Sequence, residues 1–136
     1  MPPMRRVDVA IGVVRRGNQI LICQRRSDDR FGGLWEFPGG KCHAGEEPQA
    51  CLARELMEEL AIEARIVRKL AVIHHDYPDL RVALHPFLCE CDGKEPKPIA
   101  SQQLKWVEAG EMTALRFPPA NGALLKELSR DLGGGA

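Results

Sequence analysis

Residues 39–62, which read GGKCHAGEEPQACLARELMEELAI, decide the fold. Pro48 suits the first turn of a helix, where a missing backbone N–H costs nothing. Apolar side chains then recur every three or four residues, which predicts a helix from Pro48 to about Ala61. The stripe that we expect this helix to bury comprises Ala50, Ala53, Leu56, Met57 and Leu60.

Three carboxylates lie on this helix at i, i+3 and i+4, so they share one face: Glu55, Glu58 and Glu59. Their mutual repulsion costs a few tenths of a kcal/mol for each pair, and a solvated surface would tolerate that cost. The alternative is a site for a hard cation, because clusters that offer only oxygen suit Mg²⁺ or Mn²⁺.

Strands are predicted on both sides of this segment. Upstream, 7–14 and 19–24 are rich in β-branched residues and flank a plausible turn, so they predict a hairpin, followed by a loop over 27–33. Two glycines, Gly39 and Gly40, are expected to let a ligand approach the backbone closely.

Downstream, strands are expected over 66–73 and 81–89, separated by a turn at 76–79, with a further strand near 104–107. Phe117-Pro118-Pro119 introduces a last helix, and 133–136 are expected to form a frayed tail. This order predicts one domain over 1–136 of the α+β class, with α/β/α layering.

Composition limits the function. Lys plus Arg and Asp plus Glu each total 19, so there is no net positive charge to bind a nucleic acid polymer. The five cysteines contain no C-x-x-C pair, which argues against a zinc ribbon and favours the reducing cytoplasm. No stretch is long and apolar enough to predict a membrane segment or an export signal.

Residues 40–62 carry a family resemblance. Gly40, five residues, Glu46, seven residues and then Arg54-Glu55-Leu56-Met57-Glu58-Glu59-Leu60 resemble the signature of the Nudix hydrolases. The resemblance implies the Nudix fold, an α/β/α sandwich with a mixed β-sheet between helices. It also implies that Mg²⁺, or Mn²⁺ as a substitute, is the cofactor.

The resemblance further implies roles for individual residues. Glu55, Glu58 and Glu59 would bind the metal together with the carbonyl of Gly39, and Glu55 and Glu58 would also serve catalysis. Arg54 and Glu46 would pair to hold the loop against the helix. An ordinary surface ion pair, worth ~0–1 kcal/mol, is the alternative for these two residues.

Beyond the signature, Cys23-Gln24-Arg25, the stretch 34–41, Trp106 and 117–121 resemble MutT-type enzymes of this family. These enzymes convert 8-oxo-dGTP to the monophosphate and pyrophosphate, which removes oxidised guanine before DNA replication and so serves DNA repair. The substrate contacts implied here are Arg25, Phe37, Gly40, Lys41 and Asn121.

Two positions depart from the family pattern. Ala61 stands where the family usually has glycine, which should cost about 1 kcal/mol if the residue is left-handed. Ala100 stands where many relatives have a glutamate that supplies a metal ligand or a base. The general base is therefore open: Glu55 or Glu58 could suffice, or Glu95 could come in from the loop 93–98.

Two rival functions remain. A Nudix enzyme for another nucleotide, such as CTP or dCTP, would share the helix and differ only in the base pocket. A catalytically silent Nudix module would bind a nucleotide or a partner, which Ala100 weakly favours and the intact carboxylates disfavour. The expected partner is a small nucleoside triphosphate, and the protein would be a monomer or a homodimer.

Overall fold

The computed structural model describes residues 5–28, 31–91 and 93–128. The predicted frayed tail at 133–136 lies outside these ranges. Two helices and eight strands form the framework, in the order β1, β2, β3, β4, α1, β5, β6, β7, β8 and α2. Short 3-10 helices, Ala109–Ala114 and Pro119–Asn121, lie between β8 and α2.

One mixed sheet contains all eight strands, in the order β3-β2-β1-β7-β5, with β4 on β1, β6 on β7 and β8 on β2. Among the strands in the described ranges, β1 and β7 are the one parallel pair, from Arg5 opposite Leu80 to Arg15 opposite Glu90. The strands are β1 Arg5–Arg16, β2 Gln19–Gln24, β3 Trp35–Glu36, β4 Gly39–Lys41, β5 Ala64–Lys69, β6 Ile73–Tyr77, β7 Leu80–Cys91 and β8 Gln103–Glu108.

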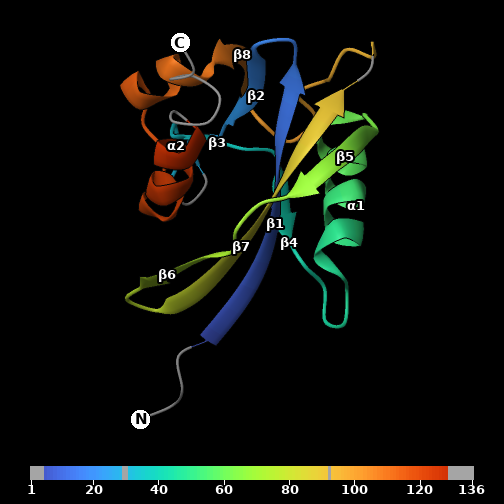
Figure 1. The fold of residues 1–136 in the computed structure, drawn as a ribbon. Helices are drawn as coiled ribbons and strands as arrows, with labels where there is room; N and C mark the ends of the chain where they lie inside the picture. Colours follow the sequence, from blue (N-terminus) through green and yellow to red (C-terminus); the bar gives the residue numbers. More distant parts are fainter. Residues whose placement is uncertain (1–4, 29–30, 92, 129–136) are drawn as a thin grey trace.

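Helices cover both faces of the sheet. Because side chains alternate along a strand, β1 directs Ala10 and Val14 to one core and Ile11 and Val13 to the other. The first core packs against α1 (Pro48–Leu60) and the second against α2 (Gly122–Leu128), and Figure 1 shows the two helices on opposite sides of the sheet. The predicted α/β/α sandwich is confirmed.

The helix α1 has the predicted bounds, but the predicted buried stripe is partly wrong. It buries Cys51, Leu52, Leu56 and Leu60, whereas Met57 is 44% exposed and the two predicted alanines, Ala50 and Ala53, are exposed. The predicted and the observed stripes share Leu56 and Leu60, and both have the spacing of a helical face. The one with more leucine side chain is buried because it removes more apolar area from water.

Ala61 ends α1 in the left-handed conformation, with φ 56° and ψ 39°. Its backbone N–H donates to Met57 O at 3.1 Å, and the N–H of Ile62 reaches Leu56 O at 3.4 Å. These bonds satisfy carbonyls at the helix end. Alanine therefore occupies the conformation for which glycine is normally required.

The second half differs from the prediction in one respect. The expected strand 66–73 is divided, because β5 ends at Lys69 and β6 begins at Ile73. Between them Leu70 is buried, and its N–H donates to Pro86 O at 2.9 Å. β5 and β6 pair with different parts of β7, so the strand structure is interrupted where the chain passes from one part to the other.

Within the part of the chain that the structure describes, no helix has the length and apolar character needed to cross a membrane.

Candidate active site

Arg54 connects the loop after β4 to the carboxylates of α1. Its Nε and Nη2 donate to the two oxygens of Glu46, each at 2.9 Å, so the predicted pair is present and bidentate. Its Nη1 donates to Glu55 Oε1 at 2.9 Å and to Glu58 Oε2 at 3.2 Å, and Nη2 reaches Lys41 O at 3.2 Å. One guanidinium therefore fixes the loop and two of the carboxylates together.

Glu46 is held as a carboxylate by this arrangement. The hydrogen bonds from Arg54, followed by one from the His43 backbone N–H at 2.9 Å, lower the pKa of Glu46 to about 2. The same contacts raise the pKa of Arg54. The ion pair is consequently fully charged throughout the neutral range.

Glu59 and Glu55 form a close carboxyl pair one helical turn apart. Burial, then the hydrogen bond and charge of Glu55, and then the charge of Glu36 raise the pKa of Glu59 to about 8, while a hydrogen bond with the Gly39 backbone opposes this. Two such groups in contact require a shared proton or a cation. Without a cation, Glu59 therefore keeps its proton at neutral pH.

Gly39 and Gly40 are required by the protein itself. A Cβ on Gly39, whose φ is +145°, would lie 2.0 Å from Ala10 O of β1. A Cβ on Gly40 would lie 2.5 Å from the carboxyl carbon of Glu55. Packing supplies a further reason for both glycines, because they let β4 lie against β1 and let Glu55 lie under β4. Close approach of a ligand to them stays a prediction.

The donor set fits Mg²⁺ or Mn²⁺, since Glu55 and Glu59 offer oxygen atoms and carry an unfavourable like-charge contact that a cation would relieve. In their present positions, no three of the described His, Cys, Asp and Glu side chains form a ready cage for a metal. Glu58 faces Arg54, and its side chain is 58% exposed. A cation bound by Glu55 and Glu58 would therefore compete with Arg54 for their carboxylates.

The partner of Glu95 is Arg16 and not a residue of the carboxyl pair. Its carboxylate accepts a 2.6 Å hydrogen bond from Arg16 Nη1, and the Arg16 guanidinium lies 4.1 Å from the centre of a Trp106 ring. Ala100 is exposed, and its carbonyl accepts from Arg26 Nε at 3.3 Å.

A cavity of about 250 Å³ lies on the α2 side of the sheet. It brings together four of the five predicted substrate residues, namely Arg25, Phe37, Lys41 and Asn121. The fifth, Gly40, does not line it and lies against Glu55 instead. The remaining walls are mostly apolar and come from β1, β6, β7 and the segment before α2: Val9, Ile11, Tyr77, Leu80, Val82, Leu84, Pro118 and Ala120.

Asn121 is a buried polar residue at the end of this cavity, 7% exposed. Its Nδ2 donates to Pro118 O at 3.4 Å, and no residue in the described ranges bonds to its Oδ1. An amide has two N–H donors, so one N–H and the oxygen remain for a ligand.

Besides the aliphatic walls, sequence reasoning did not assign Glu36, Phe31 and Tyr77 to the cavity. Glu36 accepts a 2.8 Å hydrogen bond from Arg25 Nη1, which orients the arginine at the cavity wall. The alternation in β3 next to the buried Phe37 could have indicated Glu36. The two aromatic residues lie in segments that the sequence identified only as a loop and a turn.

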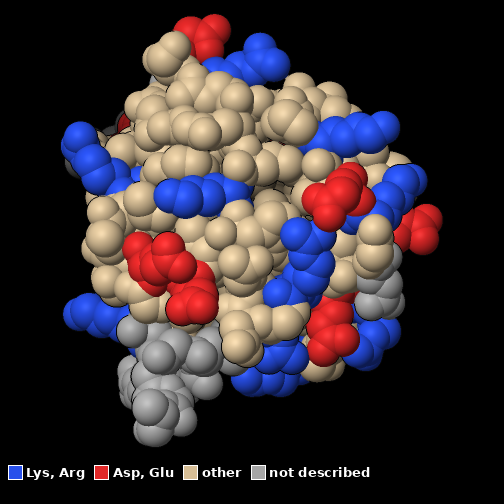
Figure 2. Space-filling view, turned by 90° about the horizontal axis from the view of Figure 1, so that it is seen from above, with Lys and Arg blue, Asp and Glu red and all other residues tan. Residues whose placement is uncertain are grey.

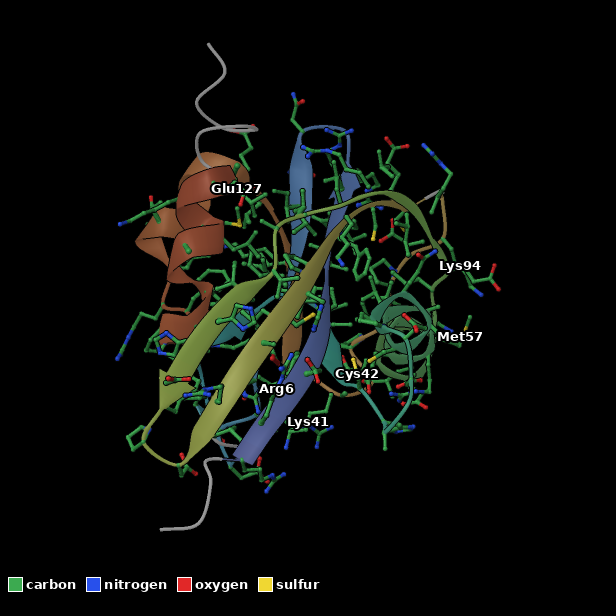
Figure 3. The ribbon with its side chains drawn as sticks, turned by 60° about the horizontal axis from the view of Figure 1, so that its bottom comes forward. Arg6, Lys41, Cys42, Met57, Lys94 and Glu127 are labelled. Atoms are coloured by element: carbon green, nitrogen blue, oxygen red, sulfur yellow. The ribbon has the colours of Figure 1, made fainter. Side chains whose placement is uncertain are left out.

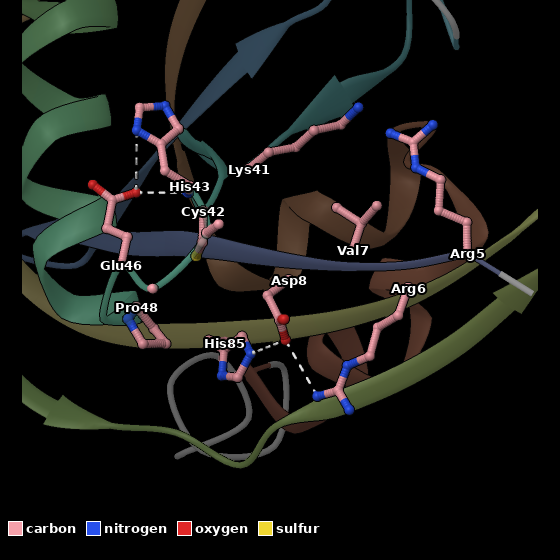
Figure 4. A pocket seen from close by; sticks show the side chains of 12 residues that line it. Arg5, Arg6, Val7, Asp8, Lys41, Cys42, His43, Glu46, Pro48 and His85 are labelled. Atoms are coloured by element: carbon pink, nitrogen blue, oxygen red, sulfur yellow. Dashed lines mark hydrogen bonds and ion pairs between the residues drawn. The ribbon is translucent and has the colours of Figure 1, made fainter.

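A larger cavity of about 540 Å³ lies at the start of β1, next to the loop 42–46 (Figure 4). Within it, Asp8 bonds His85 Nε2 at 3.0 Å and Arg6 Nη2 at 3.3 Å. Of the predicted substrate residues it includes only Lys41, which borders both cavities. Figure 3 shows Cys42 turned toward α1, with Lys41 and Arg6 near the start of β1. The walls of this cavity are more polar than those of the cavity on the α2 side, so it suits a nucleobase less well.

The face seen in Figure 2 carries no broad patch of one charge. In Figure 2, basic and acidic side chains are interspersed over the visible face. This agrees with the equal counts of basic and acidic residues, 19 each.

Comparison with known proteins gives a consistent result. The NUDIX domain family matches residues 10–127. The chain is 32% identical over 128 residues to an 8-oxo-dGTP diphosphatase of Escherichia coli K12, covering 93% of this chain and 99% of that protein. It is also 32% identical over 125 residues to a CTP pyrophosphohydrolase of the same strain, covering 90% and 91%.

Among solved structures, the E. coli ORF135 protein resembles the chain with a TM-score of 0.80 and 28% identity, covering 98% of this chain and 96% of that one.

Proposed function

Because the chain belongs to the NUDIX domain family, we propose that it hydrolyses 8-oxo-dGTP to 8-oxo-dGMP and pyrophosphate with the help of Mg²⁺. The observation that carries the proposal is the convergence of Arg25, Phe37, Lys41 and Asn121 on one largely apolar cavity. The similarity to an 8-oxo-dGTP diphosphatase over nearly the whole chain supports it.

The cavity would hold the base. Its aliphatic walls suit the faces of a purine, and Asn121 presents an N–H and a carbonyl oxygen to one edge. Guanine has two acceptors at O6 and N7, but oxidation at C8 places a proton on N7. The oxidised edge then matches the amide twice, whereas guanine sets an acceptor against the amide oxygen.

Lys41 lies at the rim of this cavity and on the strand that leads to the carboxylates, so it would neutralise phosphate charge. Glu55, Glu58 and Glu59 would hold Mg²⁺, which supplies positive charge to the phosphate oxygens and makes water more acidic. Arg54 fixes Glu55 and Glu58 before the substrate arrives.

The proton of the attacking water needs an acceptor. We assign this role to a carboxylate on α1, Glu55 or Glu58, because these side chains belong to the group that would hold the cation, whereas Ala100 has no acidic group and Glu95 pairs with Arg16 away from that group. The reaction belongs to the cytoplasm, where the five free cysteines of the described chain stay reduced.

A second candidate substrate is CTP or dCTP, which the similarity to a CTP pyrophosphohydrolase favours. The same carboxylates would serve its hydrolysis, and its base would make different contacts in the cavity.

The test is to incubate the purified protein with Mg²⁺ and 8-oxo-dGTP, dGTP, CTP or dCTP and to identify the products. We expect pyrophosphate and the monophosphate, fastest from 8-oxo-dGTP, and loss of turnover in the Glu59→Gln variant with the fold retained. Binding of a nucleotide without any product would instead indicate a silent module. Equal turnover in the Glu59→Gln variant would exclude the carboxylate site.

A further inference from the structure

Phe31 has an unfavourable backbone conformation. Its φ is +59°, in the left-handed region that bulky L-residues rarely adopt. Glycine or asparagine would adopt the same conformation at lower cost. Strain of this kind persists where the surrounding structure or the function requires the side chain.

Main-chain hydrogen bonds hold the turn around Phe31. Arg25 N–H donates to Leu34 O at 2.9 Å and Gly33 N–H to Arg25 O at 3.1 Å, which closes the base of the loop. Leu34 N–H donates to the carbonyl of Phe31 at 3.1 Å. These bonds use main-chain atoms only, so a residue without an aromatic ring could make the same turn.

The ring of Phe31 lies against Tyr77, with centroids 5.4 Å apart and planes inclined by 43°. Tyr77 is itself fixed, because its hydroxyl accepts a 3.2 Å hydrogen bond from Ala120 N–H and His75 packs on its edge at 4.7 Å. Both aromatic residues line the base cavity, and Ala120 precedes Asn121.

We propose that Phe31, supported by Tyr77, forms an aromatic wall that stacks on the nucleobase and determines specificity in favour of purines. This inference rests on the proposed nucleotide hydrolysis. Stacking grows with the overlapping ring area, so a two-ring base gains more from Phe31 than a pyrimidine does. Asn121 would hydrogen-bond the edge of the base, whereas Phe31 would contact its face.

The test measures binding of 8-oxo-dGMP, dCMP and inorganic pyrophosphate by calorimetry in Mg²⁺, for the wild type, Phe31→Asn and Phe31→Trp. Asparagine tolerates the left-handed backbone but has no ring, whereas tryptophan retains an aromatic face. We expect Phe31→Asn to bind 8-oxo-dGMP about 10- to 100-fold more weakly, with a smaller loss for dCMP. Its affinity for pyrophosphate and its thermal midpoint should not fall. Phe31→Trp should restore the binding of 8-oxo-dGMP.

Unchanged affinity of Phe31→Asn for 8-oxo-dGMP would overturn the proposal that Phe31 stacks on the base. An equal loss of affinity for pyrophosphate, which has no base, would overturn it too. If the wild type hydrolyses 8-oxo-dGTP and Phe31→Asn binds normally, only this inference fails. If the wild type neither binds 8-oxo-dGMP nor hydrolyses any of the triphosphates, the proposed function fails with it.

Discussion

Replacing Gly39 by alanine should mainly reduce stability, whereas replacing the adjacent Gly40 should mainly reduce activity. A Cβ at position 39 would meet backbone atoms of β1, Ala10 O at 2.0 Å and Ile11 Cα at 2.8 Å, and the φ of +145° disfavours alanine. Neither atom can move without separating β4 from β1. We expect Gly39→Ala to lose ~3 kcal/mol or more of unfolding free energy, or about 10 °C in the thermal midpoint.

The three atoms nearest to a Cβ at position 40 would be those of the Glu55 carboxyl group, at 2.5–2.8 Å. That group ends a flexible side chain, so it can rotate away at a cost of ~1 kcal/mol. Gly40→Ala should therefore fold normally but lose roughly 10- to 100-fold in cation affinity and kcat/KM, because Glu55 leaves its place beside Glu59.

The assays are thermal unfolding, Mn²⁺ titration and hydrolysis kinetics on both variants. Gly110→Ala is the matched control, since a Cβ there meets nothing within 4 Å. Wild-type cation affinity in Gly40→Ala would refute the role given to the position of Glu55. A wild-type thermal midpoint in Gly39→Ala would refute the packing of β4 on β1.

Three further variants test other parts of the account. Glu59→Gln should raise the thermal midpoint of the cation-free protein at pH 9 more than at pH 5. The reason is that the pKa of the Glu59 carboxyl group rises from 4.5 to about 8 on folding, so its stabilising contribution is lost as the pH rises through that interval. An equal shift at both pH values, measured in a chelator, would contradict the raised pKa. Asn121→Ala should reduce kcat/KM for 8-oxo-dGTP roughly 10- to 100-fold more than for dGTP with little change in midpoint, and equal losses would show that the amide does not distinguish the bases. Ala61→Gly should stabilise the protein by roughly 0.5–1 kcal/mol in chemical denaturation with hydrolysis unchanged, and no gain would mean that the left-handed alanine carries no strain.

The sequence predicts well where local rules act. The start of α1 at Pro48, the end of the helix at Ala61 and the spacing that brings Arg54 to the carboxylates all depend on residues within a few turns of one another. The helix bounds follow from helical periodicity and from the residues at the helix ends. The pairing of Arg54 with Glu46, which crosses one short loop, was implied by the family resemblance.

Features that depend on tertiary packing were predicted less well. Which of two neighbouring stripes α1 buries is decided by the sheet beneath it, and Met57 is exposed as a result. The break between β5 and β6 follows from the path along β7. Phe31 and Tyr77, 46 positions apart, meet only because β6 and the loop before β3 converge on one cavity.

The site shows the same division. Resemblance to the family indicated Arg25, Phe37, Lys41 and Asn121, and the fold brings all four to one cavity. The reason for Gly39 and Gly40 was not visible in the sequence, since Ala10 and Glu55 become their neighbours only after β4 pairs with β1.

The central claim is that the base cavity and the carboxylates of α1 act as one site for oxidised guanine nucleotides. Its most direct test is the kcat/KM of the wild-type protein for 8-oxo-dGTP, dGTP and CTP, measured side by side in Mg²⁺ by release of pyrophosphate. The account predicts the highest value for 8-oxo-dGTP, with dGTP lower by at least about tenfold. A value for CTP that equals or exceeds the value for 8-oxo-dGTP would contradict it.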